Sequence, residues 1–106
     1  MPLSGTFTVG TGVQTLDALI NAYTPAWPPC HEFTELIMSP DSGNSGTVAE
    51  GDSSVNITTK IYSSLMPSTG GPVTKRVTST GQRIFAKNIY IVGSAVGQVL
   101  HVEATI

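Results

Sequence analysis

The sequence predicts one mainly β domain over residues 1–106, a small antiparallel β-sandwich or barrel (jelly-roll-like) with one short helix near its N-terminus. The length of 106 residues and the mass of 11.1 kDa suit a single domain. The chain is rich in hydroxyl and turn-forming residues, with 11 Ser, 14 Thr, 11 Gly and 7 Pro. Short segments that alternate between apolar and polar residues recur between the turns, which is typical of antiparallel sheets with one solvated face.

The expected helix lies in the first quarter of the chain. Residues Thr6 to Val9 alternate between two glycines and predict a short strand before it. The segment Thr11-Gly12-Val13-Gln14 has the spacing of a capping box, and apolar residues then recur at helical spacing until Pro25. This pattern predicts a helix of about two or three turns.

A proline-rich segment at about residues 24–31 follows the helix. Pro25, Pro28 and Pro29 crowd around Trp27 in this segment. Because proline has no backbone N–H to give to a sheet, the segment is predicted to be a connecting arm or loop.

Period-two patterns begin at Phe33. Leu36 and Met38 form one apolar face, and a dense turn cluster follows from Pro40 to Gly46. This arrangement predicts a hairpin that returns through Thr47–Glu50.

The middle of the chain predicts two more strands. The first is an alternating face made by Val55, Ile57, Thr59 and Ile61. Residues 63–72 are predicted to be a loop. The second strand, Val73 to Thr78, is expected at a sheet edge because it carries two adjacent cations.

The C-terminal third predicts an antiparallel hairpin. Asn88 to Val92 is a nearly continuous apolar strand, residues 93–97 form a turn, and Val99 to Ile106 runs back. In the returning strand one face is apolar and the other is polar. The apolar face holds Leu100, Val102, Ala104 and Ile106, and the polar face holds His101, Glu103 and Thr105.

Charge is unusually scarce in this sequence. Charged residues make up 11% of the chain, against about 25% in an ordinary soluble domain. The net charge is −2, and the five cations are Lys60, Lys75, Arg76, Arg83 and Lys87. We therefore expect no nucleic-acid partner, since the chain has no positive electrostatic field strong enough to bind a phosphate backbone. An uncharged hydroxyl surface costs little to desolvate, which favours assembly with neighbours.

The sequence also favours a protein made in the cytoplasm without a membrane partner. The N-terminal residues lack a basic and apolar signal pattern, and no apolar run approaches the length of about 18 residues that a membrane span needs. Cys30 is the only cysteine, which excludes an intramolecular disulfide framework.

The residues around Cys30 include types that bind zinc and other transition metals. Cys30, His31, Glu32 and Glu35 lie within six residues, and His101 is the second histidine of the chain. In an extended strand Glu32 points away from His31 and Glu35, and the helical His-Glu-x-x-His pattern is absent. The prediction is that the chain binds no metal and no cofactor.

The sequence gives little support for a calcium site or for a catalytic motif. Asp41 and Gly46 match the first and sixth positions of a calcium loop, but Gly43 stands at the third and Asp52, not Glu, at the twelfth. An Asp that caps its own turn explains the same residues. The chain has neither a Gly-x-Ser-x-Gly elbow nor a phosphate loop, so we expect no catalytic residues and no enzyme.

Trp27 is the only tryptophan, and Tyr23 lies near it in the sequence. Such a pair suits either of two roles. It can stack on sugar rings, or it can seal a small core or a contact between subunits, where one large aromatic supplies much buried area. The second role is favoured.

Two blocks of the sequence resemble small β-rich proteins found among the virion genes of tailed bacteriophages. One block is Leu36 to Val55, with Asn44-Ser45-Gly46-Thr47 at its centre, and the other is Asn88 to Glu103, with Ile89-Tyr90-Ile91-Val92-Gly93-Ser94-Ala95-Val96-Gly97-Gln98. Ser45 stands where threonine is commoner, and Ala49-Glu50 replaces an aromatic residue and a valine. The resemblance covers about two-thirds of the chain.

The resemblance implies a structural protein of the virion. The leading expectation is a capsid cement or decoration protein that docks on the major capsid protein. This chain is expected to dock as a homotrimer at local three-fold positions. The expected contact residues are Tyr23, Trp27, Pro28 and Pro29 as anchors, with Arg76 and Arg83 as polar contacts at the rim. The alternative is a tail, baseplate or fibre accessory protein, with carbohydrate binding as one form of it.

Overall fold

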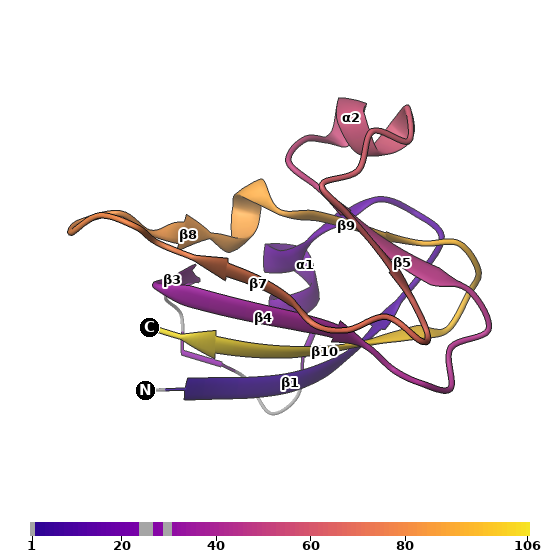
Figure 1. Cartoon of the computed structure of the whole chain (residues 1–106), viewed down its shortest axis with the longest axis horizontal. Coiled ribbons are helices and arrows are strands. Elements are labelled where there is room, and N and C mark those ends of the chain that lie inside the picture. Colours follow the sequence, from indigo (N-terminus) through magenta and orange to yellow (C-terminus); the bar gives the residue numbers. More distant parts are fainter. Residues whose placement is uncertain (1, 24–26, 29–30) are drawn as a thin grey trace.

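Two four-stranded antiparallel sheets form the body of the protein (Figure 1). This computed structural model describes residues 2–23, 27–28 and 31–106. Strands account for 44% of the chain and helical segments for 14%, so the predicted mainly β class is confirmed. The helical part comprises two short α-helices and one 3-10 turn among the described residues, where the sequence predicted a single helix.

The sheets draw their strands from distant parts of the chain. Sheet A has the order β1 (Pro2–Val9), β10 (Gln98–Thr105), β4 (Glu35–Pro40) and β7 (Val73–Arg76). Sheet B has the order β2 (Gln14–Thr15), β9 (Tyr90–Gly93), β5 (Thr47–Gly51) and β6 (Ser64–Pro67). A small two-stranded pair joins β3 (Glu32–Phe33) to β8 (Ile84–Phe85), and the 3-10 turn η1 (Ala86–Asn88) follows β8.

The core lies between the two sheets. Alternate residues of β4 and β10 point inward, as the apolar faces of these segments predict, and Leu36, Met38 and Leu100 are fully buried. Val48 and Ile91 meet them from sheet B. The predicted inner face of the last strand is confirmed for Leu100, Val102 and Ala104, whereas Ile106 lies beyond the end of β10 and is exposed.

Helix α1 (Leu16–Asn21) covers one open side of the sandwich, behind sheet A in Figure 1. Its apolar residues Leu19 and Ile20 join the core. The helix is shorter than predicted, because Thr15 and not the segment at 11–14 caps it, accepting a hydrogen bond from the Ala18 N–H at 3.1 Å. The residues just before Leu16 are held as β2 against β9, which prevents an earlier start.

Both predicted hairpins are wrong. β4 belongs to sheet A and β5 to sheet B, so the turn after Pro40 carries the chain from one sheet to the other. The same holds for β9 and β10, on either side of the turn at 94–97. Each strand pairs with partners from elsewhere in the sequence, and local turn chemistry does not reveal that choice.

The predicted strand at 55–61 is also wrong, because it is helix α2 (Ser54–Thr58). Ser53 starts the helix by accepting a hydrogen bond from the Asn56 N–H at 3.1 Å. The helix ends in a Schellman turn, in which the Ile61 N–H donates to Asn56 O at 2.7 Å and the Lys60 N–H donates to Ile57 O at 3.2 Å. Lys60 occupies the left-handed position of that turn, with φ of 64°, where glycine is commoner.

The segment from 63 to 78 agrees with its prediction in part. It contains strand β6, where a loop was predicted, and Met66 of that strand is buried in the core. The following strand, β7, lies at the edge of sheet A as its cations predict. Lys75 and Arg76 point to opposite faces of that edge.

Candidate functional site

Two turns lie side by side at the end of the sandwich away from the chain termini, and they are here termed the paired turns (Figure 1). They are residues 41–46, between β4 and β5, and residues 94–97, between β9 and β10. The Thr47 N–H donates to Ser94 Oγ at 2.8 Å, and the Ser94 N–H donates to Thr47 O at 2.9 Å. These two bonds join the turns directly.

Gln98 ties the paired turns together from the inside. Its side chain is buried, with 1% of the residue exposed. Its Oε1 accepts from the Gly46 N–H at 2.8 Å, and its Nε2 donates to Ser45 Oγ at 3.1 Å. A Cβ at Gly46 would lie 2.2 Å from Ser94 Oγ, so only glycine leaves room for this arrangement.

The side-chain amide of Asn44 takes the hydrogen-bonding place that a neighbouring strand's backbone would have beside Val99. Its Nδ2 donates to Val99 O at 2.9 Å, and its Oδ1 accepts from the Val99 N–H at 2.7 Å. The amide therefore satisfies both backbone groups of Val99, at the start of β10. Asn44 and Gln98 stand in the two blocks that resemble virion proteins, and the sequence alone did not single out either as a site residue.

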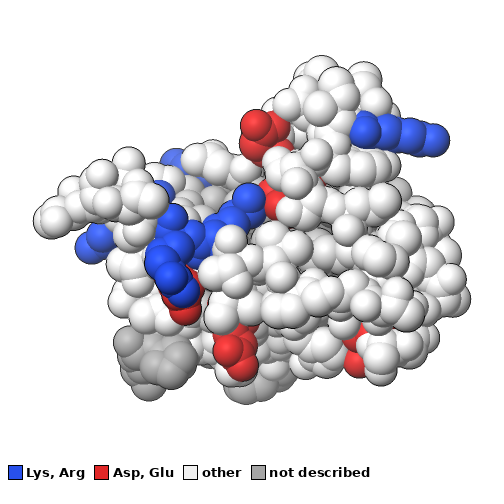
Figure 2. All heavy atoms as spheres, viewed as in Figure 1, with Lys and Arg blue, Asp and Glu red and all other residues white. Residues whose placement is uncertain are grey.

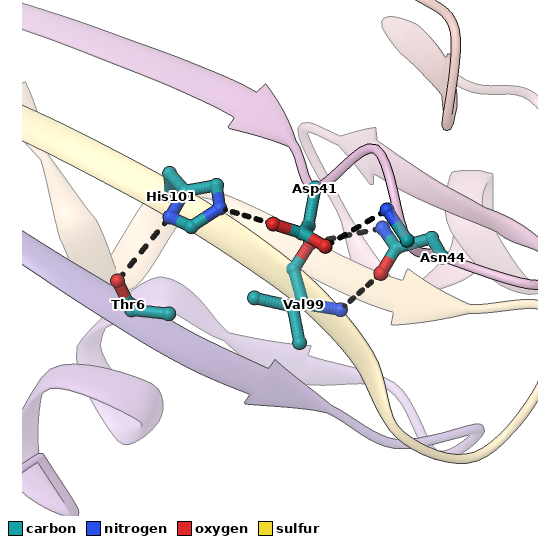
Figure 3. Close-up of polar contacts among 6 residues, drawn as sticks. Thr6, Asp41, Asn44, Val99 and His101 are labelled. Atoms are coloured by element: carbon teal, nitrogen blue, oxygen red, sulfur yellow. Dashed lines mark hydrogen bonds and ion pairs between the residues drawn. The ribbon is translucent and has the colours of Figure 1, made fainter.

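A polar chain runs from the first turn onto the outer face of sheet A (Figure 3). His101 Nε2 lies 2.8 Å from Asp41 Oδ1, and His101 Nδ1 lies 3.2 Å from Thr6 Oγ1. The other Asp41 oxygen accepts the Gly43 N–H at 2.9 Å. The contacts connect the turn to β10 and to β1.

The pKa of Asp41 is lowered below its usual value mainly by the hydrogen bond from His101. The hydrogen bond from the Gly43 N–H lowers this pKa further. Charge on His101 acts in the same direction, while desolvation opposes it. An ionised Asp41 accepts only, so His101 Nε2 is the donor to it.

Hydroxyl, imidazole and carboxylate in this order are the groups of a nucleophile, a base and an orienting residue. Here the carboxylate is also bound to the backbone of its own turn, as the turn interpretation of Asp41 predicted. Each partner comes from a different element, and the side chains of His101 and Asp41 are 43% and 39% exposed. The geometry supports a surface tie that fixes the turn against the sheet.

The outer face of sheet A carries many hydroxyl residues around this tie, with the apolar residues Ile37 and Val99 among them. Its hydroxyl residues alternate with the core positions, and they are Ser4, Thr6, Thr8, Ser39, Thr74 and Thr105. The face has one ion pair at its rim, in which Arg76 Nε donates to Glu35 Oε2 at 2.7 Å. On the side of the molecule seen in Figure 2, most of the basic atoms gather on the left, in the region of β7 and β8, and most of the right half is uncharged.

The structure separates the residues considered for a metal site. His31 Nδ1 contacts Asp17 Oδ1 beside α1, Glu35 pairs with Arg76, and His101 pairs with Asp41. Cys30 lies outside the described residues. Within residues 2–23, 27–28 and 31–106, no group of three or more His, Cys, Asp or Glu side chains is placed to hold a metal ion.

Tyr23 and Trp27 pack against the core. The Trp27 ring lies in edge contact with Phe33 at 6.1 Å and with Phe7 at 5.7 Å between centroids, and Tyr23 lies 4.8 Å from Phe7. Both residues are half-buried. This packing agrees with the core-sealing role favoured for Trp27.

The other predicted contact residues lie in different segments of the chain. Pro28 is exposed, and Pro29 lies outside the described residues. Arg76 stands at the rim of the outer face of sheet A. Arg83 is exposed in the loop before β8, where it donates to Gln82 O at 2.8 Å. The contact surface that these residues were expected to form stays a prediction.

Comparison with family models, with curated proteins and with solved structures finds no match for this chain. Among the described residues, no helix has the length and apolar character to cross a membrane.

Proposed function

We propose that this chain is a non-catalytic docking protein of a virus particle, namely a cement protein that binds and stabilises the assembled shell of a tailed bacteriophage. The observation that carries the proposal is the hydroxyl-rich outer face of sheet A, described above. The two sequence blocks that resemble virion proteins are the reason for proposing a tailed-bacteriophage particle as the binding partner. The partner is the major shell protein, and a homotrimer is the expected form of the docked protein.

The outer face of sheet A suits docking because removing its groups from water costs little free energy. Hydroxyl groups lose less on leaving water than ionised groups do, and they find new partners easily. The charges of Glu35 and Asp41 already have partners within the face. Glu103 is the exception, since it is exposed and has no partner among the described residues.

Cementing needs affinity for the assembled state and no chemistry. A protein that binds only the assembled shell stabilises it by about 2.7 kcal/mol per site when its free concentration is a hundred times its dissociation constant. The effect is multiplied over the many equivalent sites of a shell.

The first test measures the ratio of this chain to the major shell protein in purified particles, by quantitative mass spectrometry. A ratio near one supports cementing over the whole lattice. A few copies per particle would place the chain at a vertex or the tail, and no copies would overturn the virion proposal.

A variant pair tests the docking face. Ile37→Lys places a charge in the middle of the outer face of sheet A, opposite Glu103 on β10, which favours retention of the fold. Val55→Lys places the same charge on α2, where Val55 is 70% exposed. We expect Ile37→Lys to weaken co-sedimentation with shells that lack the protein about tenfold, and Val55→Lys to leave it unchanged. Equal behaviour of the two variants would contradict docking through sheet A.

One observation favours the alternative, a sugar-binding accessory of a tail. A groove of about 270 Å³ lies between α2 and sheet B, and its lining includes Tyr62 with hydroxyls of Thr11, Thr47 and Ser94. An aromatic ring beside hydroxyl groups is the usual chemistry of sugar binding. In a titration with host glycans, Tyr62→Ala should then abolish binding while Trp27→Ala leaves it. Absence of binding to any glycan would remove this alternative.

A further inference from the structure

β1 forms one edge of sheet A. Among the described residues no strand pairs with its outer side, and β1 is the border of sheet A in Figure 1. The Asp41 N–H donates to Val99 O at 3.1 Å, so the backbone of Val99 faces β4. Val99 is the register partner of Thr8, and backbone direction alternates along a strand. The N–H and C=O groups of Ser4, Thr6 and Thr8 therefore point away from the sheet.

The other sheet edges carry devices that discourage a further strand. On β7, Lys75 points into the space between the sheets and Arg76 stands on the opposite face. β2 has two residues, and β6 has four and ends at Pro67. Short edges, charges that point inward and proline are the usual means of protecting a sheet edge.

In β1, Pro2 at the first position is the one protective feature of this kind. The strand has eight residues, Pro2–Val9, all of them uncharged. Its register with β10 runs without a bulge from Pro2 opposite Thr105 to Val9 opposite Gln98. Pro2 stands at the start of the strand, so the rest of the edge keeps its donors.

A groove runs beside this edge. It has a volume of about 360 Å³ and is lined by Thr6, Phe7 and Thr8 of β1 and by Leu19, Ala22 and Tyr23 at the end of α1. One wall thus offers backbone groups of a strand, and the other offers mainly apolar side chains.

We propose that the edge of β1 and this groove bind a single extended segment of a partner chain, which adds to sheet A as a further strand. Backbone groups of the segment pair with Ser4, Thr6 and Thr8. Its alternate side chains are small and apolar and fill the groove, while the others are uncharged and polar and extend the hydroxyl face. The lack of charge on β1 selects against segments that carry charges on either face.

A single segment fits this site better than a second copy of the chain. Two copies joined edge to edge through β1 would bring both α1 helices to the same side of the joined sheet. Leu19, Ala22 and Tyr23 of each copy would then compete for the groove, whose volume suits a few side chains. The inference gives the binding mode of the proposed docking function and rests on it for the source of the segment.

The experiment needs no virus particle. The probe is a seven-residue peptide of alternating threonine and valine with blocked ends and two lysines added after it for solubility. The readout is amide hydrogen exchange of the whole chain, followed by NMR. We expect added peptide to slow exchange at Ser4, Thr6 and Thr8 about tenfold or more. The same peptide with alternate N-methylated amides should have no effect, because it cannot pair.

A matched pair of proline variants tests the edge. Thr8→Pro removes an N–H that points outward on β1, and Thr74→Pro removes the equivalent outward N–H on β7, so both are placed where a sheet tolerates proline. Peptide affinity should fall about tenfold in the first variant and stay unchanged in the second. If Thr8→Pro does not fold, Thr8→Lys tests the same edge by adding a charge.

Three results would overturn the inference. One is the absence of slowed exchange at β1 with the peptide, and another is equal loss of affinity in both proline variants. The third is self-association of the chain through β1, seen by sedimentation, which would make a second copy the occupant. These results leave the copy-number test unaffected, so failure of the binding mode and failure of the docking function are distinguishable.

Discussion

The two sheets are held together in two different ways, at the paired turns and in the middle of the sandwich. At the turns, Gln98 of sheet A forms neutral hydrogen bonds of 2.8 and 3.1 Å to Gly46 and Ser45, the residues just before β5 of sheet B. In the middle, Lys75 of sheet A reaches Glu50 of sheet B, with Nζ 3.2 Å from Oε1. That carboxylate oxygen has no partner with hydrogen-bond geometry among the described residues, so charge alone holds the contact.

The difference shows why the two regions respond differently to change. A directed neutral bond stabilises by about 1 kcal/mol, and its loss leaves a polar group without a partner. The Glu50 carboxylate is buried while the Lys75 side chain is 31% exposed, so the contact offsets a desolvation cost that falls mainly on Glu50, and loss of Lys75 costs more than the pair contributes. Substitutions in each region test this contrast.

Lys75→Met should be the most damaging of the changes. Glu50 is 1% exposed and would be left as an uncompensated charge. We expect a loss of about 3 kcal/mol in the free energy of unfolding, measured by urea denaturation at neutral pH. The double variant Glu50→Gln with Lys75→Met should recover most of the loss. A double variant as unstable as Lys75→Met would show that packing of the lysine stem, and not charge, is what matters.

Gln98→Ala tests the neutral tie. It removes the acceptor of the Gly46 N–H and the donor to Ser45 Oγ. The expected loss is about 2 kcal/mol, since a buried donor loses its partner. Gln98→Glu keeps the acceptor and the volume while it adds a buried charge, and it should be no better than alanine. Stability of Gln98→Ala within 0.5 kcal/mol of the parent, on the order of a surface substitution, would contradict the role given to Gln98.

Gly46→Ala tests the close approach of the paired turns. The new Cβ would meet Ser94 Oγ at 2.2 Å and force that hydroxyl away from the Thr47 N–H. The expected cost is about 1 kcal/mol, that of one lost hydrogen bond. Ser94→Ala should cost a similar amount, and the double variant should cost no more than either alone. Additive costs would show that the two residues act independently.

The paired turns also show what the sequence could predict and what it could not. The alternation in β4 and β10 identified their buried faces, because a strand with one face in the core leaves a period of two in the sequence. The turn clusters were placed correctly, but each changes sheets, and the same turn residues serve a hairpin or a crossing. Pairing between β4 and β10 joins residues more than fifty positions apart, with no local signal.

Helix α2 and the polar sites were missed for related reasons. Alternating Val55, Ile57 and Ile61 fit a strand, but the cap at Ser53 and the packing of Ile57 on Gly51 made the segment helical. Ser53 is a residue type that caps helices, but in the sequence it stands in a turn-forming run and does not by itself indicate a helix. The contact between His101 and Asp41 depends on how β10 is aligned with its neighbouring strands, and residue types alone do not predict that alignment.

His101→Ala separates the surface tie from the interior contacts. Because the folded state lowers the pKa of Asp41, ionised Asp41 stabilises the fold above its ordinary pKa of 3.8, and that contribution is lost as the pH falls through the lower folded value. Removal of His101 should raise the pKa of Asp41 toward 3.8, and the Gly43 N–H keeps part of the lowering. An NMR titration of the Asp41 carboxyl measures the change. Thr6→Val is the control, because it leaves the bond between His101 and Asp41 intact, and an equal shift in both variants would contradict the assignment.

Arg76→Ala should have the smallest effect and so marks the other end of the comparison. Arg76 makes two contacts of 2.7 Å to Glu35 Oε2, closer than Lys75 comes to Glu50, but its side chain is 69% exposed. Water screens the pair and solvates either partner when the other is removed, so we expect a loss of about 0.5 kcal/mol or less in urea denaturation. The loss should shrink further in about 1 M salt, where surface pairs are screened. A loss as large as that of Lys75→Met would mean that contact distance, and not burial, sets the value of an ion pair in this protein.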